Sequence, residues 1–380
     1  MIALIASTFP RFREDAEPAF ILELAREVSR FADVKVFVPA HPLSDDTTDW
    51  AGVPVDRFRY FPIRSQETLC GDGGIPAKLT TWRGKLLLPF LLAAECALFM
   101  KLLRDQRIRA IHVHWVLPQG FAFALARTVL PRRSNAPMTI LSFHSGRGET
   151  VSGFYRWLEG WIVRSFDRIT VNNQKTRSLL QKEHRTTVDY LSMGMPRDVE
   201  AMALPPAKDY RLLASIGRLV PVKGYLELLD EWVKRRGALK DFSLTLIGKG
   251  PLGAQIQDYI ERQGLAEQIR LHSNPSRSLI LRTLSEAGYY LQPSLELPNG
   301  QTEGFGLSVV EALHLGCTPV VSAVGGLPEV VGDVGYVCAS ASQMFDELLD
   351  GGIRPADPLQ CREHARQFSW GSKNLQELYS

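Results

Sequence analysis

Short apolar runs alternate along this chain with segments of helical periodicity, and polar loops separate them. Residues 2–6 read as an apolar strand, residues 7–13 as a loop, residues from about 18 to 31 as a helix, and residues 34–38 as the next strand. A strand, a crossover helix and a second strand form a βαβ unit, in which the two strands pair in parallel. Because the alternation continues to residue 338, the sequence predicts an α/β protein built on parallel sheets.

The length of the chain indicates more than one such sheet. Its 380 residues, of which 45% are hydrophobic, exceed what a single core usually holds. A polar, proline-bearing segment at residues 197–210 reads as a hinge, and a second series of strands and helices follows it. We therefore expect two domains.

The stretch from residue 301 to residue 321 carries two acids beside a helix start. Glu303 lies in a glycine-bearing loop, and Glu311 lies one turn into a helix that is expected to begin at Ser308. Free N–H groups and the helix dipole favour an anion there, and acids beside it suit hydroxyl groups, so a nucleotide sugar fits both. Alternatively, Ser308 and Glu311 form a capping box and Glu303 is a solvated loop acid.

The loop after the expected strand at residues 212–216 supplies positive charge. Arg218 and Lys223 flank a turn at the carboxyl end of that strand. An arginine fork and a lysine point charge can hold a diphosphate from two sides, although both residues can also be exposed loop cations. The turn that contains Gly248 and Lys249, after the next strand, is a weaker signal.

Histidines mark two strand ends in the first half. His112 and His114 share one face of the strand at residues 108–115 and could bind a metal, but no third ligand stands at a useful spacing. His144 ends the strand at residues 138–144, on the edge where ligands of open α/β sheets gather, and is either structural or catalytic. In the first loop, Arg11 and Arg13 are either solvated cations or ligand contacts.

The first half of the chain is basic relative to the second. Residues 1–198 carry 27 Lys and Arg against 20 Asp and Glu, whereas the remainder carries 17 against 21. This asymmetry points to an anionic surface such as lipid headgroups. Residues 78–109, with Trp82, Arg83 and Lys85 near one end, are either a helix that lies on an anionic membrane or a buried helix. No basic tract with interleaved aromatics supports a nucleic-acid partner.

Cysteine usage and the apolar runs indicate the compartment. Five widely spaced cysteines without a C-x-x-C pair favour a reducing cytoplasm over a disulfide framework or a zinc site. The N-terminus reads as a strand rather than a signal peptide, and we find no run of about 18 apolar residues, so we expect no membrane-spanning segment. The expected location is the cytoplasm, with peripheral contact at the cytoplasmic face of the inner membrane if the helix at residues 78–109 faces lipid.

Taken in order, the motifs resemble the retaining glycosyltransferases of family 4, also called group 1 glycosyl transferases, which have the glycosyltransferase-B fold. The match covers roughly residues 212–338 and includes SIGRLVPVKG, LIGKGP, LQPS, EGFGLSVVEALHLGCTPVVSAVGGLPEVV and GYVC. The first half matches more loosely, through HVHW, SFHSGR and SMGMP, and FSW with a closing helix also resembles the family.

This resemblance implies two Rossmann-like domains that face a cleft. The N-terminal domain, residues 1–198, would hold most of the acceptor, and a C-terminal helix at about residues 369–380 would cross back onto it. The C-terminal domain, residues 199–368, would hold the donor, a nucleoside diphosphate sugar.

The resemblance also assigns site residues. Four are expected to be catalytic: Arg218 and Lys223 on the diphosphate, and Glu303 and His144 near the transferred sugar. Glu311 would bind the ribose. The other donor-binding positions are loop residues of the same motifs, namely Gly217, Gly248, Lys249, Asn274, Gly304, Phe305, Gly306, Leu307 and Ser308.

The implied reaction is transfer of a hexose, with retention, from a UDP- or GDP-linked donor to a glycan or lipid-linked sugar in bacterial surface polysaccharide or glycolipid synthesis. Cations and a helix N-terminus can stabilise the diphosphate that leaves without a metal, and the sequence has no D-x-D motif, so we expect neither metal nor cofactor. The alternatives are a nucleotide-sugar epimerase of the same fold and a nucleotide-sugar binding protein without transfer activity.

The first half departs from the family pattern at three places. Its first loop reads STFPRF instead of a glycine pair, and Ser145 and Arg147 stand where the family usually has Gly and Asp. Met195 and Pro196 stand where a hydrophobic residue and Asp are common. These departures leave the acceptor and the role of His144 open.

Overall fold

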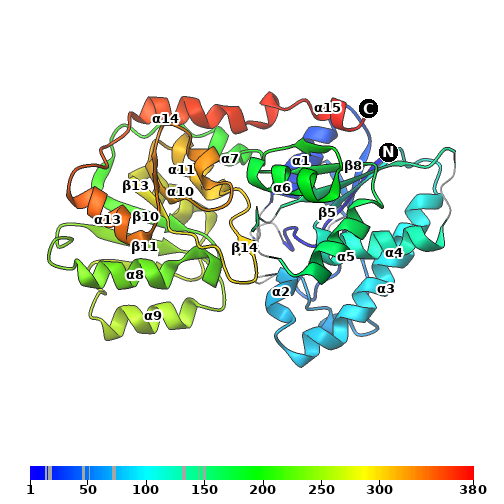
Figure 1. Ribbon diagram of the computed structural model, residues 1–380, viewed down its shortest axis with the longest axis horizontal. Coiled ribbons are helices and arrows are strands. Elements are labelled where there is room, and N and C mark those ends of the chain that lie inside the picture. Colours follow the sequence, from blue (N-terminus) through cyan, green and yellow to red (C-terminus); the bar gives the residue numbers. More distant parts are fainter. Residues whose placement is uncertain are drawn as a thin grey trace.

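The computed structural model describes residues 1–12, 15, 19–44, 48–50, 52–70, 74–130, 134–144, 146–148 and 151–380, without the side chains of residues 76 and 77. Figure 1 shows two α/β halves side by side, with the first half of the chain on the right and the second half on the left. Arg13, Pro18 and Ser145, on which sequence-based expectations rest, lie outside the described residues.

The first half is built on an eight-stranded sheet with the order β3-β4-β2-β1-β5-β6-β8-β9. Every neighbouring pair is parallel except β3 with β4. The strands are β1 (Ile2–Ile5), β2 (Val34–Pro39), β3 (Asp49–Trp50), β4 (Val53–Phe58), β5 (Ala110–His114), β6 (Met138–Phe143), β8 (Arg168–Val171) and β9 (Val188–Tyr190). The central strands β1 and β5 are buried along their whole length, which explains why they read as nearly continuous apolar runs.

The second half is built on a six-stranded sheet with the order β12-β11-β10-β13-β15-β16, in which all pairs are parallel. Its strands are β10 (Asp209–Ile216), β11 (Ser243–Ile247), β12 (Ile269–His272), β13 (Ala287–Gln292), β15 (Thr318–Ser322) and β16 (Tyr336–Cys338). The two parallel α/β sheets confirm the predicted fold class. The domain boundary at residue 198 stays a prediction, and the sheets lie on either side of it.

Each sheet has a hydrophobic core on both faces. In β1, Ala3 and Ile5 pack into one core while Ile2 and Leu4 pack into the other, because successive side chains of a strand point to opposite faces. The helices that cover the sheets are α1 (Phe20–Val28), α2 (Gly74–Lys78), α3 (Trp82–Arg104), α4 (Phe121–Val129), α5 (Gly153–Val163), α6 (Gln174–His184), α7 (Arg197–Glu200), α8 (Tyr225–Lys234), α9 (Gly253–Arg262), α10 (Arg277–Glu286), α11 (Leu307–His314), α12 (Leu327–Val331), α13 (Ala341–Leu349), α14 (Pro358–Ala365) and α15 (Leu375–Leu378).

Helix α3 bears on the expectation that no segment spans a membrane. Its 23 residues contain an 18-residue window with a mean hydropathy of 2.0, of which 33% is buried, so by length and composition alone it could cross a bilayer. A search for uninterrupted apolar runs misses this window, because Glu95 breaks the run without lowering the mean much. Glu95 is buried and accepts a 2.9 Å hydrogen bond from Nε2 of Gln119, and burial raises its pKa to about 8. One face of α3 therefore belongs to the protein core.

The C-terminal segment crosses back from the second half to the first, as Figure 1 shows along the upper edge of the molecule. The expected closing helix is only the single turn α15, and Leu375, Leu378 and Tyr379 pack into the core beside α1. Trp370 packs against the turn at Gly194, where a Cβ atom would lie 2.0 Å from the indole ring. That glycine therefore makes room for the crossing segment.

The expected hinge contains the short helix α7, which contacts both halves. The guanidinium of Arg197 forms an ion pair with Glu27 of α1, and Asp198 pairs with Arg277 of α10 at 2.7 Å. The segment that joins the two sheets is thus held by charges on either side.

Candidate active site

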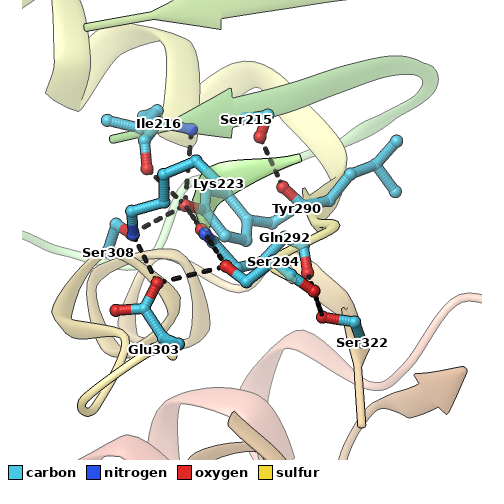
Figure 2. Close-up of polar contacts among 10 residues, drawn as sticks. Ser215, Ile216, Lys223, Tyr290, Gln292, Ser294, Glu303, Ser308 and Ser322 are labelled. Carbon is cyan, nitrogen blue, oxygen red and sulfur yellow. Dashed lines mark hydrogen bonds and ion pairs between the residues drawn. The ribbon is translucent and has the colours of Figure 1, made fainter. Parts of the chain in front are cut away.

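Lys223 and Glu303 meet at the carboxyl edge of the second sheet. Lys223 ends a 3₁₀ turn (Pro221–Lys223) in the loop after β10, and its Nζ lies 2.6 Å from Oε2 of Glu303. Figure 2 shows the two side chains pointing toward each other, with the Ser294 hydroxyl 3.1 Å from the same carboxylate oxygen. Gly224, next to Lys223, has φ +67°, and a Cβ there would lie 1.9 Å from the carbonyl oxygen of Pro293. Glycine is needed for this close approach.

The carboxyl group of Glu303 is ionised. Burial works to raise the pKa of Glu303, but the charge of Lys223, the hydrogen bonds from Lys223 and Ser294, and the charge of Arg218 together hold that pKa below its ordinary value. About a tenth of each side chain in the pair is exposed, 10% for Lys223 and 12% for Glu303.

A polar network supports this pair from behind (Figure 2). The hydroxyl of Tyr290 lies 2.7 Å from Oγ of Ser308 and 2.8 Å from the carbonyl oxygen of Ile216, so it ties the start of α11 to the end of β10. The Gln292 side chain donates to Oγ of Ser294 at 2.9 Å, and that hydroxyl reaches Glu303. The network fixes the carboxylate in place.

Helix α11 begins without a side-chain cap. Gly306, with φ +95°, is its N-cap residue, and the structure gives no hydrogen bond to the amide N–H groups of Leu307 and Ser308 within the described ranges. The buried ring of Phe305 packs edge-on against Phe368 and anchors the loop before the helix. The alternative in which Ser308 and Glu311 form a capping box is wrong, because the helix starts one residue earlier than expected and Ser308 bonds Tyr290. The helix start is a place for an anion.

Glu311 is engaged in an ion pair. Its Oε1 lies 2.8 Å from Nη2 of Arg277, and the same guanidinium binds both carboxylate oxygens of Asp198, at 2.7 and 3.0 Å. The alternative in which Glu311 serves only its own helix therefore fails. Its expected role at the ribose stays a prediction, and a ribose there would compete with Arg277.

The remaining donor-loop residues lie at the ends of neighbouring strands. Gly217 and Gly248 are in contact, since a Cβ on Gly248 would lie 1.7 Å from the carbonyl oxygen of Gly217. Arg218 is exposed and close enough to lower the pKa of Glu303. Lys249 accepts a backbone bond from Leu219, whereas Asn274 is an exposed loop residue. Neither Lys249 nor Asn274 has a hydrogen bond to Lys223 or Glu303 in the described part of the chain.

The backbone at His144 lies against the loop that carries Glu303. Strand β7 (Gly146–Arg147) pairs antiparallel with β14 (Gln301–Thr302), so the loop after β6 is joined to the loop that carries Glu303. Figure 1 shows β14 between the two halves. The loops are so close that a Cβ on Gly304 would lie 2.2 Å from the carbonyl oxygen of His144. The loops that carry His144 and Glu303 are therefore adjacent.

The ring of His144 lies in the first half. It stacks on His114 with ring centroids 5.0 Å apart and contacts Phe20 and Trp115. Burial lowers its pKa to about 3, so the imidazole is neutral at pH 7. Among the described residues, this ring forms no hydrogen bond with the carboxylate of Glu303.

Arg147 occupies a buried acidic cluster. Its guanidinium lies 3.0 Å from Glu159 and 2.5 Å from Glu183, and His184 lies 2.9 Å from Glu159. Glu159, Glu183 and His184 are close enough to hold a metal ion, but Arg147 already places a cation there. The departure from the family pattern at Arg147 is thus matched by acids from α5 and α6, and it anchors β7.

Arg11 and His112 are both engaged in structural contacts. Arg11 was expected to be solvated or to bind a ligand, yet it is buried and forms a 2.7 Å ion pair with Asp15. The nitrogens of His112 lie 2.7 Å from the Tyr379 hydroxyl and 2.6 Å from Oγ of Ser142. These partners, rather than a metal, account for the histidine pair of β5.

Sequence reasoning missed several residues of the site. Asn173 caps α6 through its side-chain oxygen and donates from Nδ2 to the carbonyl oxygen of Gly304 at 2.8 Å, which links the halves. Ser294 and Tyr290 were visible only as part of a strand-end motif. Arg277 carried no sequence signal, because an arginine in the first turn of a helix reads as a surface residue.

The family comparisons cover most of the chain. Residues 197–353 match the model for "Glycosyl transferases group 1", and residues 18–189 match the model for "Glycosyl transferase 4-like domain". One curated relative, the D-inositol 3-phosphate glycosyltransferase of Mycolicibacterium smegmatis, is 28% identical over 56% of this chain. That match covers 52% of the relative, so the chain spans about half of its length.

Solved structures of the same architecture cover the chain from end to end. Sucrose-phosphate synthase from Thermosynechococcus elongatus gives a TM-score of 0.75 at 18% identity, over 100% of this chain and 98% of its own. HepE of Anabaena, in complex with UDP and glucose, gives a TM-score of 0.67 at 15% identity, over 99% and 98%. At these identities the likeness bears on the fold, and it confirms the glycosyltransferase-B fold expected from the sequence.

Proposed function

Because this chain belongs to the group 1 glycosyl transferases, we propose that it transfers a hexose, with retention, from a UDP- or GDP-linked sugar to a glycan or lipid-linked sugar. The observation that carries the proposal is the ionised pair of Lys223 and Glu303 beside the uncapped start of α11. A donor sugar nucleotide presents both a diphosphate and hydroxyl groups. This site offers a cation and free amides for the first and a carboxylate for the second.

The charges of the site suit departure of a nucleoside diphosphate. As the bond to the sugar breaks, negative charge grows on the diphosphate, and Lys223, Arg218 and the amides of Leu307 and Ser308 are placed to stabilise it. These groups are the reason we propose transfer without a metal. Glu303 stays ionised beside the sugar and accepts hydrogen bonds from its hydroxyls.

We place the acceptor at a membrane surface because of helix α3. Its exposed face carries Trp82, Leu86 and Phe90, which are 70%, 53% and 42% exposed, at a spacing of four residues. Exposed cations stand at both ends of the helix, at Arg83 and Lys85 and at Lys101 and Arg104, while its one acid, Glu95, is buried. An apolar stripe flanked by cations suits an anionic lipid surface at the cytoplasmic face of the inner membrane.

Donor binding and transfer are tested with purified protein. Thermal unfolding is followed with UDP, GDP and their glucose, galactose, mannose and N-acetylglucosamine derivatives, since a ligand that binds only the folded state raises the midpoint. The derivative that gives the largest shift is then incubated with lipid-linked sugar acceptors. Transfer with the anomeric configuration of the donor is expected. A changed sugar from donor alone would indicate an epimerase, and binding without any product would indicate a binding protein.

Membrane docking has its own test. Sedimentation with vesicles that contain phosphatidylglycerol is expected for the wild type at low salt and should weaken as salt is added. The double variant Trp82→Glu, Leu86→Glu should lose it, whereas Leu359→Glu, at a 66% exposed leucine of α14, should not. Equal binding to neutral vesicles, or none to anionic ones, contradicts the lipid-surface proposal.

A further inference from the structure

The start of α6 is bound to the second half. Nδ2 of Asn173 donates to the carbonyl oxygen of Gly304 at 2.8 Å. The backbone N–H of the next residue, Gln174, donates to Oε2 of Glu329 at 2.8 Å. Glu329 belongs to α12, which follows β15 of the second sheet. Two successive residues of the first half therefore contact two separate segments of the second half.

Glu329 lies between the N-termini of two helices. Gly326 is the N-cap residue of α12, so Glu329 stands in the first turn of its own helix, and its carboxylate also reaches the first residue of α6. Unsatisfied N–H groups and the helix dipole make both positions favourable for a negative charge. Burial and the contact with Glu329 raise the pKa of the Tyr190 hydroxyl, so this phenol of β9 lies beside the same carboxylate. The first half thus meets Glu329 with an amide and a hydroxyl group.

The start of α12 supports the backbone of Glu303. The backbone N–H of Gly326 donates to the carbonyl oxygen of Glu303 at 3.3 Å, and a Cβ on Gly325 would lie 1.8 Å from the same oxygen. Gly326 also abuts the first half, since a Cβ there would lie 3.0 Å from Cβ of Asn173. Because the backbones are this close, a shift of α12 would move the loop that carries Glu303.

On the first half, the same junction reaches the loop of His144. Asn172 precedes Asn173 at the end of β8, and its Nδ2 donates to the carbonyl oxygen of His144 at 3.3 Å. The antiparallel pair of β7 with β14 joins the loop after β6 to the loop before α11. The loops of His144 and Glu303 are therefore held together by this strand pair and by the junction between α6 and α12.

We propose that Glu329 is a positioning residue for transfer. Its carboxylate accepts the N–H of Gln174, and through α12 it sets the loop of Glu303 against the loop of His144. This inference rests on the proposed function, in which the second half binds the donor while His144 and the acceptor belong to the first half. The sugar then passes between the halves, so their spacing at this junction matters for the rate. Glu329 acts through the backbone and does not touch substrate.

Hydrogen exchange of the protein without substrate tests the positioning role. In Glu329→Ala the amide of Gln174 loses its acceptor, and exchange at the start of α6 should be about three- to tenfold faster, the size of one hydrogen bond. A residue that only capped α6 would change nothing further. Because Glu329 also positions the loops, exchange should rise as well in peptides that contain residues 146–148 and 300–304, where β7 pairs with β14. Mass spectrometry of the digested protein measures both regions.

Matched variants test the functional consequence. The diphosphate-binding groups belong to the second half, so Glu329→Ala should bind UDP or GDP with wild-type affinity while kcat falls about three- to tenfold. Glu329→Gln keeps an oxygen that accepts the N–H of Gln174 and should retain most of kcat. The control Lys175→Ala breaks the next contact of α6 with the second half, a 3.4 Å pair with Glu296 in which the side chains are 38% and 35% exposed. It should leave exchange and kcat near those of the wild type.

Faster exchange confined to the start of α6, or unchanged exchange in every region, would overturn the proposal, as would an unchanged kcat in Glu329→Ala. A loss of nucleotide affinity as large as the loss of kcat would also overturn it, because Glu329 would then be a donor-binding residue. If Glu329→Ala does not fold, Glu329→Asp replaces it, since its side chain is one methylene shorter and holds the charge away from Gln174. Absence of transfer by the wild type would refute the proposed function and leave the exchange result standing.

Discussion

The two halves of the molecule hold their polar groups in opposite ways. In the second half, the carboxylate of Glu303 is ionised and pairs with Lys223 at a strand edge. In the first half, burial lowers the pKa values of His112, His114 and His144, so these three rings are neutral, and Arg147 is enclosed by Glu159 and Glu183. Charges in the second half can exchange partners with an incoming anion. The polar groups of the first half already have partners inside the protein, so they support the site without binding the anion.

The largest effect should come from breaking the buried cluster of the first half. Arg147→Met leaves Glu159 with His184 alone and Glu183 with the half-exposed Arg156 alone, and removing one partner of a buried ion pair costs about 3–5 kcal/mol of the free energy of unfolding. Urea denaturation measures it. The control Arg366→Met breaks an exposed pair with Glu363 and should change stability little. Similar curves for both variants would show that the cluster is not a structural anchor.

The second-largest effect should come from lowering the pH, which should destabilise the first half. The pKa values of His112 and His144 lie near 3, and that of His114 also lies below its ordinary value, so as pH falls below about 6.5 the unfolded chain binds protons that the folded chain does not. Stability is therefore complete above that pH and is lost on acidification. Each histidine lowers the free energy of unfolding by up to about 1.4 kcal/mol for each pH unit of acidification. The three together lower it by up to about 4 kcal/mol per pH unit.

Denaturation midpoints at pH 7, 6 and 5 test this, and His112→Asn should flatten the slope by about a third. A stability profile that is flat over this range would mean that the histidines are protonated in the folded protein. The comparison between a neutral first half and an ionised second half would then fail.

Removing charges from the second half should affect catalysis more than stability. Arg218→Ala and Glu303→Ala are each expected to lower kcat at least about a hundredfold, because each loses a contact to charge that develops in the transition state. The control Glu363→Ala removes an exposed carboxylate on the same half, and its rate should match the wild type. Initial rates at saturating donor measure the effect, and near-normal rates in both site variants would refute the assignment.

The smallest effect should appear at Arg277, which competes with the ribose for Glu311. Arg277→Ala removes the cation that competes with the ribose and should lower the donor KM about two- to threefold. Arg277→Lys should fall between this variant and the wild type. A rise in KM would show instead that Arg277 orients Glu311 for the donor.

The success of prediction from the sequence differs between the two halves. Gly217, Gly224 and Gly248 are required by close backbone contacts, and such requirements leave a recognisable motif, so the loops of the second sheet were found correctly. The buried partners of His144 and Arg147 come from strands and helices distant in the chain, and no local pattern marks them. The expected helix start at Ser308 is one residue late, because Gly306, with its positive φ, is the N-cap residue.

Charge alone was also a poor guide to exposure. Arg11 reads as a loop cation but is enclosed with Asp15, and α3 reads as interrupted by Glu95 although that acid is buried against Gln119. In each case a single partner from elsewhere in the chain decides, and a sequence without its fold does not reveal which residue that is.

The central claim is that Lys223, beside Glu303 and the start of α11, holds the donor diphosphate without a metal. Titration calorimetry of UDP and GDP against the wild type and Lys223→Ala, each with EDTA present, tests it directly. The wild type should bind one of the two nucleotides in EDTA, and Lys223→Ala should bind it at least about tenfold more weakly, in line with loss of a charged hydrogen bond. Equal affinity of the two proteins, or binding by the wild type that EDTA abolishes, would contradict the account.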